Sequence, residues 1–327
     1  MLETSINNVH KTIFSFERLP KHGKEYWFFL FTSNNPKSGR QLMLTFGDQN
    51  ISSYIVDDCK IKEKYSFKGS HKGPSSYLFY DRKMHRFPTL LSSIDIKRDR
   101  LEVKSGKREI LFEGKYPNYA LKIKENGKVV CNLKTKKGSD YTEHEVIDYF
   151  SGDIGAGYIN LLLGFRGKLN GSAFSGHCYV QKVISTAPIP GIPWYWCRVY
   201  FPGKYILDFL QPHISVLNLA KEFTVHAYFY DIRKKRKYSF RNVKVSKYGN
   251  KNRQFLVHGK SRESEFTIML DRYAKKRFSL NSLGKLTYEQ NLVTVSSFSF
   301  ETKDILITKK DTGEGIGIME DAYGYIL

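Results

Sequence analysis

The sequence predicts an all-β protein built from antiparallel hairpins, and three observations support this. Aromatic residues make up 15% of the 327 residues, with 22 Tyr and 23 Phe, and aromatic side chains favour strands. The chain also holds 25 Gly, as turn-rich β proteins do. Apolar runs are short and alternate with polar residues, and the best helical candidates are only residues 142–150 and 216–221. This pattern favours β-sandwiches or up-and-down barrels, and the length admits two domains or one large β architecture.

The expected strands come mostly in pairs separated by a short turn. Residues 25–32 and 41–46 flank an Asn-Asn-Pro-Lys-Ser-Gly turn. Residues 119–124 and 128–133 are joined across Asn126-Gly127, and Asn-Gly is the strongest short hairpin signal. The other expected strands are residues 92–103, 107–112, 222–230, 237–245, 255–258, 265–271, 292–301 and 304–308.

The chain carries a net charge of +21 and has a pI near 9.6. Such a charge attracts phosphates, anionic membrane surfaces or acidic partners. The basic residues recur at turn tips, as at 134–137, 233–237 and 275–277, which is typical of solvated hairpin ends. No zinc finger, RNP signature or basic heptad helix accompanies them, so specific nucleic-acid binding is disfavoured. Peripheral contact with an anionic membrane surface, or a basic interaction surface for anionic lipid or nucleic acid, stays open as an alternative.

The cysteines and the N-terminal segment indicate an intracellular protein. Four cysteines without C-x-x-C spacing favour free buried thiols, although Cys178 and Cys197 could approach each other across adjacent strands. The first 14 residues lack an apolar signal-peptide core, and the longest apolar runs, such as residues 26–31, are too short to span a membrane. We therefore expect a soluble, cytoplasmic protein without a cofactor.

The most informative stretch is residues 171–211. Residues 179–183 alternate apolar with polar side chains, as a half-buried strand does, and Trp194 and Trp196 fall on one face of the next expected strand. Two indoles facing one way, beside a strand that carries Gln181 and Lys182, suggest the wall of an apolar cavity. An ordinary barrel core filled by the two indoles is the alternative.

Three motifs carry a resemblance to a known family. They are GHCYVQKV at residues 176–183, WYW at 194–196 and GIGIMEDAYGY at 315–325. In order and spacing they resemble the lipocalin-like superfamily that includes the carotenoid hydratases (hydroxyneurosporene synthases). The resemblance implies two lipocalin-like antiparallel β-barrel or sandwich halves in tandem, with residues 1–187 and 188–327 as the two domains. It also implies a hydrophobic ligand such as an isoprenoid, bound near the domain junction.

One departure from the family pattern bears on activity. Where the hydratases of the family have Asp-His, this chain has Gln181-Lys182. Hydration or cyclisation of a polyene needs a proton donor, and a buried carboxylic acid serves because burial raises its pKa. Gln cannot supply that proton. A non-catalytic ligand-binding role is therefore preferred, and a hydratase, cyclase or isomerase acting on a prenyl or polyene substrate is the alternative.

The site residues follow from the motifs. Lys182 and Glu320 are the catalytic candidates. The candidate ligand-binding residues are His177, Tyr179, Gln181, Trp194, Trp196, Asp208 and Tyr323. We expect Gln181, Lys182, Trp194, Trp196 and Glu320 to converge on one cavity. Structural ion pairs are the alternative roles of Glu320 and Asp208, since the chain is rich in basic residues. No metal site is expected, because His177, His213 and His226 lack the spacing of metal ligands.

Overall fold

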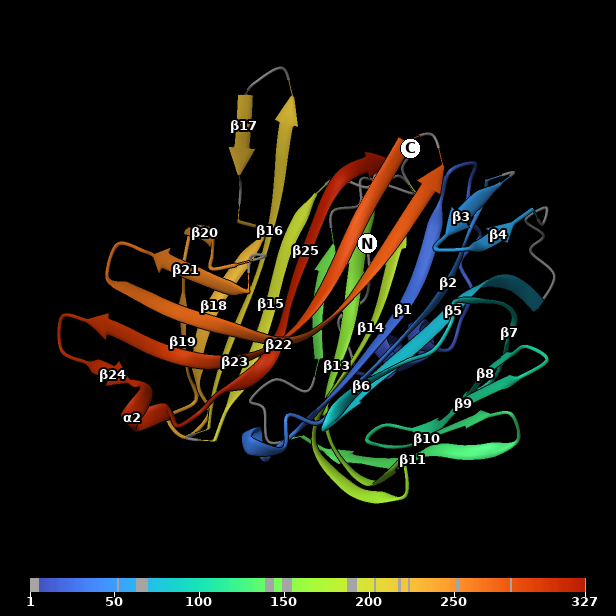
Figure 1. Cartoon of the computed structure of the whole chain (residues 1–327), viewed down its shortest axis with the longest axis horizontal. Helices are drawn as coiled ribbons and strands as arrows, with labels where there is room; N and C mark the ends of the chain where they lie inside the picture. The colour runs from blue at the N-terminus through green and yellow to red at the C-terminus, as the bar shows by residue number, and fades with distance from the viewer. Residues whose placement is uncertain are drawn as a thin grey trace.

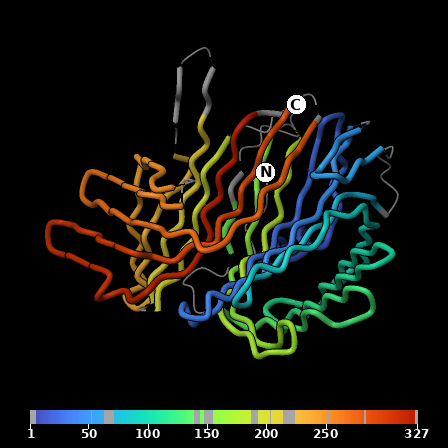
Figure 2. Tube along the Cα trace, in the orientation of Figure 1, coloured from blue at the N-terminus to red at the C-terminus, as the bar shows by residue number. Residues whose placement is uncertain are grey.

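The chain folds into two curled sheets that lie side by side (Figures 1 and 2). The structure, a computed structural model, describes residues 6–51, 53–62, 70–138, 144–148, 155–186, 193–202, 204–216, 219–222, 224–250, 253–282 and 284–326. One sheet has 12 strands and the other has 13, and neighbouring strands within the described residues pair antiparallel. The predicted all-β fold with two barrel or sandwich halves is confirmed.

Ten strands of the first sheet close a barrel. They are β1 (Lys24–Ser33), β2 (Gln41–Gln49), β5 (Ser70–Asp81), β7 (Leu90–Lys97), β8 (Arg100–Lys104), β9 (Arg108–Lys115), β10 (Asn118–Glu125), β11 (Lys128–Lys137), β13 (Ala156–Leu169) and β14 (Ser172–Ser185). The order around the barrel is β11-β10-β9-β8-β7-β5-β2-β1-β14-β13, and β13 pairs back onto β11. Two further strands, β6 (Lys83–Arg86) and β12 (His144–Asp148), pair with β5 and β13.

The second sheet takes its central strands from the C-terminal part of the chain. They are β15 (Trp194–Phe201), β16 (Tyr205–Val216), β18 (His226–Asp231), β19 (Arg236–Ser239), β20 (Asn242–Tyr248), β21 (Gln254–Lys260), β22 (Ser264–Ser282), β23 (Gly284–Thr302) and β25 (Ile316–Ile326). Their order is β19-β18-β16-β15-β25-β23-β22-β21-β20. The short strands β17 (Leu219–Glu222), β24 (Leu306–Thr308), β3 (Tyr54–Val56) and β4 (Cys59–Ile61) attach to this sheet.

Sheet membership follows the predicted halves closely but not completely. It changes between the end of β14 and the start of β15, whereas the predicted boundary at 187/188 lies outside the described residues and stays a prediction. The early strand β3 pairs with β22, with Val56 opposite Leu280. A segment of the N-terminal half therefore belongs to the second sheet.

Helix is limited to short pieces, and neither predicted helix is present where the structure describes it. Residues 144–148 form β12 and residues 219–222 form β17, because pairing with β13 and β16 satisfies their backbone groups. The helices are α1 (Ile6–Ile13), α2 (Lys309–Thr312) and the 3₁₀ turn η1 (Pro36–Ser38). α1 was not among the predicted helices, and it buries Val9 and Ile13 against the core of the first barrel.

The three largest apolar clusters hold the fold together. One fills the first barrel, one fills the curl of the second sheet, and a third lies between the two sheets. On β1, Trp27, Phe29 and Phe31 belong to the first cluster, whereas Phe28 and Leu30 belong to the third. Because β1 is buried on both faces, its sequence is a continuous apolar run rather than an alternating one.

Hydrogen bonds between the sheets supplement the apolar contact. The Gln41 side chain donates to the Gly317 carbonyl over 2.8 Å, and the Tyr273 hydroxyl donates to the Gly39 carbonyl over 2.8 Å. Arg86 donates to the Lys275 carbonyl over 2.7 Å. These contacts fix the two sheets against each other and so fix the walls of the space between them.

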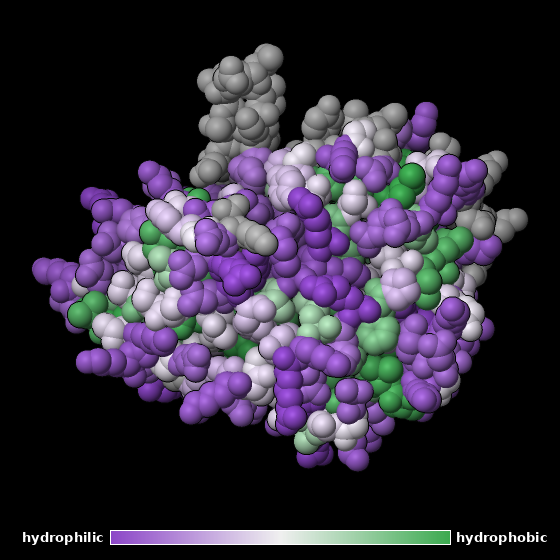
Figure 3. Space-filling view, viewed as in Figure 1, coloured by the Kyte–Doolittle hydropathy of each residue, from purple (hydrophilic) through white to green (hydrophobic). Residues whose placement is uncertain are grey.

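All four cysteines are free, and Cys178 and Cys197 lie in different cores. Within the described ranges, no group of three or more His, Cys, Asp or Glu side chains is arranged to hold a metal ion. The described part of the chain contains no helix of the length and apolar character needed to cross a membrane. Figure 3 shows hydrophilic residues over most of one face, with hydrophobic residues in smaller separate groups.

Candidate functional site

A cavity of about 410 Å³ lies between the two sheets. Strands β1, β2, β5, β13 and β14 line it from the first sheet, and β3, β15, β16, β22, β23 and β25 line it from the second. Its aromatic lining consists of Tyr26, Phe28, Phe46, Tyr158, Trp194, Trp196, Phe278 and Tyr288. The charged side chains in its lining are Lys24 and Glu320. The cavity is thus a largely apolar site with a few placed polar groups.

The alternation of side chains along the strands explains which residues line the cavity. Tyr26 and Phe28 reach it from β1, and Gln181 and Val183 reach it from β14. Trp194 and Trp196 both line it, as their predicted common face requires. The Trp196 ring also packs edge-on against Phe28, with 5.7 Å between ring centroids. The indoles therefore form part of a wall with a cavity beside it.

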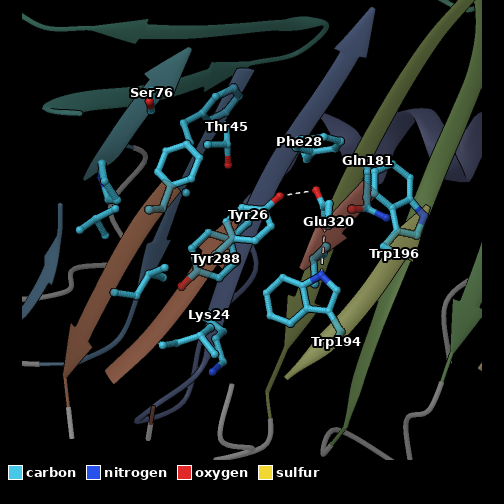
Figure 4. A pocket seen from close by; sticks show the side chains of 18 of the residues that line it. Lys24, Tyr26, Phe28, Thr45, Ser76, Gln181, Trp194, Trp196, Tyr288 and Glu320 are labelled. Carbon is cyan, nitrogen blue, oxygen red and sulfur yellow. Dashed lines mark hydrogen bonds between the residues drawn. The ribbon is translucent and has the colours of Figure 1, made fainter. Parts of the chain in front are cut away.

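Glu320 is the buried acid of this cavity (Figure 4). It lies opposite Trp196 in the pairing of β15 with β25. Its carboxylate accepts hydrogen bonds from Trp194 Nε1, at 3.0 Å, and from the Tyr288 hydroxyl. Gln290 Nε2 in turn donates to the Tyr288 hydroxyl over 2.7 Å.

Burial raises the pKa of Glu320 to about 7, although the hydrogen bonds from Tyr288 and Trp194 act to lower it. Near neutral pH the side chain is therefore present both as carboxylic acid and as carboxylate. An acid in this state can donate a proton or a hydrogen bond to a molecule held in an apolar space.

Gln181 is held by its neighbour on the same face of β14. Its Nε2 donates to the Tyr179 hydroxyl over 2.8 Å. The Tyr179 ring packs against Trp196, with 5.3 Å between centroids, and is outside the cavity lining. Tyr179 therefore orients Gln181 and packs against the Trp196 ring.

The structure corrects the expected position of Lys182. Adjacent residues on a strand point to opposite faces, so Gln181 and Lys182 cannot both enter the same cavity. Lys182 points into the first barrel, where its Nζ lies 3.1 Å from the Glu25 carboxylate. It also donates to the carbonyls of Ser15, at 2.7 Å, and Thr12, at 3.1 Å. These contacts anchor the segment after α1 and give Lys182 a structural environment away from the cavity.

Tyr323 and His177 also lie away from this cavity. Tyr323 is an odd number of residues from Glu320 on β25 and so faces the other way, where its hydroxyl accepts a hydrogen bond from Arg277. His177 stacks on Tyr200, with 4.2 Å between centroids, and lines a separate space of about 290 Å³. Burial lowers the pKa of His177 to about 4, so its imidazole is neutral at neutral pH.

Asp208 belongs to a buried polar cluster near the cavity. Its carboxylate lies 2.8 Å from an Arg198 guanidinium nitrogen and 2.6 Å from His226 Nε2. His226 Nδ1 lies 2.8 Å from the hydroxyl of Tyr158, which lines the cavity. Asp208 thus forms an ion pair with Arg198, which is the alternative role that the sequence left open for it.

Tyr158, Tyr288 and Gln290 are site residues to which none of the three motifs pointed. The alternation of Tyr288 with Gln290 on β23 was a usable signal, because it resembles the alternation on β14. Tyr158 and His226 are 68 residues apart and come from different sheets, so no local pattern connects them.

Comparison with known proteins shows which solved structures have a similar fold. The sequence matches no protein-family model and no curated protein. The crystal structure of CghA with Sch210972 is similar with a TM-score of 0.51 and 8% identity, over 93% of this chain and 88% of that chain, and a second CghA structure gives the same values. A putative AttH from Nitrosomonas europaea is similar with a TM-score of 0.46 and 11% identity, over 92% of each chain. The chain has a lipocalin-like barrel fold.

Proposed function

We propose that this protein binds a hydrophobic small molecule in the cavity between its two sheets, and that isoprenoid or polyene chains are the ligand class. The observation that carries the proposal is the cavity itself, about 410 Å³ in volume and walled mostly by aromatic and aliphatic side chains. Small-molecule sites are typically apolar clefts of this size, with a few polar groups that orient the ligand. Glu320 and Gln181 are those polar groups here, suited to the hydroxyl or carbonyl end of an apolar chain.

The fold comparison supports a ligand-binding role. CghA, which has a similar fold, was crystallised with the compound Sch210972. The aromatic walls favour an unsaturated chain, because flat apolar groups pack well against Tyr, Trp and Phe rings. The departure at Gln181-Lys182 from the hydratase pattern is consistent with binding without hydratase chemistry.

Retinol offers a direct test, because retinol bound near a tryptophan absorbs the energy of the excited indole and so quenches its emission. Trp194 and Trp196 line the cavity, whereas the third tryptophan, Trp27, lies in the core of the first barrel. We expect saturable quenching of tryptophan emission that farnesol or geranylgeraniol reverses by competition. Trp27→Phe should retain the ligand-dependent quenching, and Trp194→Phe should reduce it.

A blocking variant and a matched control make the test specific. Val183→Phe places a larger side chain at the cavity wall and should weaken retinol binding at least tenfold. Val129→Phe makes the same change at a residue that is 51% exposed, and should leave binding unchanged. Equal binding by wild type and Val183→Phe would contradict the proposed site.

A second candidate function is catalysis on such a ligand. The observation that favours it is the buried Glu320, whose pKa near 7 suits a proton donor aimed at an alkene. Incubation with prenyl or polyene alcohols, followed by mass spectrometry of the products, tests for hydration, cyclisation or isomerisation. Glu320→Gln should abolish turnover and retain binding if Glu320 supplies the proton.

A further inference from the structure

Four side chains form a hydrogen-bonded chain that begins at the cavity wall. The Tyr158 hydroxyl lies 2.8 Å from His226 Nδ1, and His226 Nε2 lies 2.6 Å from Asp208 Oδ1. The other oxygen of Asp208 accepts a hydrogen bond from Arg198 over 2.8 Å. The four residues come from β13, β18, β16 and β15, so both sheets contribute.

The partners assign the proton positions. A carboxylate that also pairs with Arg198 is an acceptor, so Nε2 of His226 carries the proton that it donates to Asp208. In the neutral imidazole Nδ1 is then the acceptor, and the Tyr158 hydroxyl donates to it. This is the arrangement in which a histidine, oriented by a carboxylate, draws a proton from a hydroxyl group.

Further hydrogen bonds from neighbouring residues hold these four side chains in place. Arg198 Nε donates to the Tyr200 hydroxyl over 2.8 Å, and the Tyr228 hydroxyl donates to Glu145 over 2.6 Å. Glu145 also lies 3.9 Å from the Arg198 guanidinium. Arg198 and Asp208 are almost fully buried, whereas the His226 side chain is 18% exposed. His226 is therefore more exposed to solvent than Arg198 and Asp208 are.

The hydrogen-bonded row of Tyr158, His226, Asp208 and Arg198 reaches the cavity at a different point from Glu320. Glu320 pairs with Trp196, Trp196 pairs with Leu210, and Leu210 pairs with His226 across three adjacent strand pairs. Three strand spacings correspond to about 14 Å along the curled sheet from Glu320 to His226. Trp196 and Leu210 line the cavity between them. Glu320 and the cluster around His226 are thus separate, with apolar residues of the cavity wall between them.

We propose that Tyr158, His226 and Asp208 form a proton relay that accepts a proton from an acidic O–H or C–H group of the molecule in the cavity. The proposal rests on the proposed function, and it specifies the ligand as an apolar molecule with one such group. In the step, the ligand proton moves to the Tyr158 oxygen as the Tyr158 proton moves to His226 Nδ1. The ligand keeps the electron pair of the broken bond and becomes an anion, Tyr158 ends as a neutral phenol, and the imidazolium faces the Asp208 carboxylate.

Dansyl fluoride tests the relay without knowledge of the natural ligand. It is a flat apolar reagent, and a phenol oxygen that attacks its sulfur displaces fluoride while the phenol proton passes to a nearby base. With the full-length protein, we expect mass spectrometry to find Tyr158 modified at least ten times faster than Tyr26, which lines the same cavity and donates to Gln49 rather than to a base.

His226→Asn is the decisive variant. The Asn carbonyl still accepts a hydrogen bond from Tyr158 but does not take its proton, so labelling of Tyr158 should fall at least tenfold while labelling of exposed Tyr248 stays constant. A Tyr158 rate that does not depend on His226, or labelling of Tyr26 without Tyr158, would overturn the relay.

A ligand-free measurement separates the two proposals. The ¹⁵N NMR spectrum of His226, assigned by comparison with His226→Asn, should show a proton on Nε2 and none on Nδ1. A proton on Nδ1 would overturn the relay, whatever the cavity binds. If no cavity tyrosine is labelled and retinol does not bind, the apolar-ligand proposal fails, and the relay that rests on it fails too. Retinol binding together with a proton on Nδ1 would overturn the relay alone.

Discussion

The Trp194 indole donates a hydrogen bond to the Glu320 carboxylate over 3.0 Å, although 126 residues separate the two in the chain. β15 and β25 are neighbours in the second sheet, with Trp196 opposite Glu320 and Trp194 two residues further along the same face. An indole N–H and an acid thus meet at the wall of an apolar cavity. The hydrogen bond between them affects the pKa of the acid.

Removal of the indole donor should raise the pKa of Glu320. Trp194→Phe keeps an aromatic ring but removes a hydrogen bond that favours the carboxylate. We expect the pKa of Glu320 to rise above about 7. A titration followed by ¹³C NMR of the side-chain carboxyl measures this change. Trp27→Phe is the control, because Trp27 donates to the Ile13 carbonyl in the other core. An unchanged Glu320 titration in Trp194→Phe would contradict the role of the indole.

The buried acid should make stability depend on pH. Glu320 titrates near pH 7 in the folded protein and near pH 4.5 when unfolded, so between these values the folded state binds more protons. The contribution of Glu320 to the unfolding free energy therefore falls as pH rises from 4.5 to 7, by up to about 3 kcal/mol. Denaturant titrations at several pH values should show a steeper decline in wild type than in Glu320→Gln. Parallel pH profiles for the two proteins would refute this.

Lys182 should matter for stability and not for ligand binding. Lys182→Met leaves the fully buried Glu25 without its ammonium partner, which typically costs about 3–5 kcal/mol. The double variant Lys182→Met, Glu25→Gln should recover much of that loss, because the remaining partner of Lys182, Glu17 at 3.5 Å, is 35% exposed and solvated. Urea unfolding measures the stability and retinol titration measures the binding. A Lys182→Met protein that keeps full stability but loses retinol binding would restore Lys182 as a site residue.

The two predicted halves should depend on each other. Fragments 1–187 and 188–327 would each expose the apolar cluster that includes Leu30 and Trp196, and β3 would be separated from β22. We expect each fragment alone to bind the dye ANS and to lack a sharp thermal transition, and the mixture to regain one. A cooperative transition in either isolated fragment would show that the halves are independent domains.

The positive charge should produce generic rather than specific binding to nucleic acid. With a net charge of +21 spread over many turn tips, binding to duplex DNA should be weak and should fall steeply with added salt. Fluorescence anisotropy with two unrelated duplexes at 50 and 200 mM salt measures this. A salt-resistant preference for one sequence would reverse the interpretation. Vesicles with and without anionic lipid test the membrane alternative in the same way.

Local patterns predicted the β elements where the deciding signal is local. The Asn126-Gly127 turn joins β10 and β11 as expected, because both residues accept the positive φ that a tight hairpin needs. The segment at residues 92–103 was wrongly predicted as one strand. A turn with Arg98 at a φ of 54° divides it into β7 and β8, and an Arg-Asp pair is a weak turn signal.

The alternation of side chains along the strands also predicted part of the site. Gln181, Trp194, Trp196 and Glu320 were grouped from three motifs, and the structure brings all four to one cavity. Lys182 was grouped with them because the motif runs through it, but its neighbour on the strand already faces the cavity.

The sequence by itself determined the all-β class, most hairpins and the common face of the two indoles, because each depends on residues close together in the chain. The tertiary structure alone decided that the cavity lies between two sheets, that Tyr288 and Trp194 meet Glu320, and that Tyr158 meets His226. These contacts join strands far apart in the sequence. The curvature of the sheets and the packing between them set such contacts, and no short pattern records either.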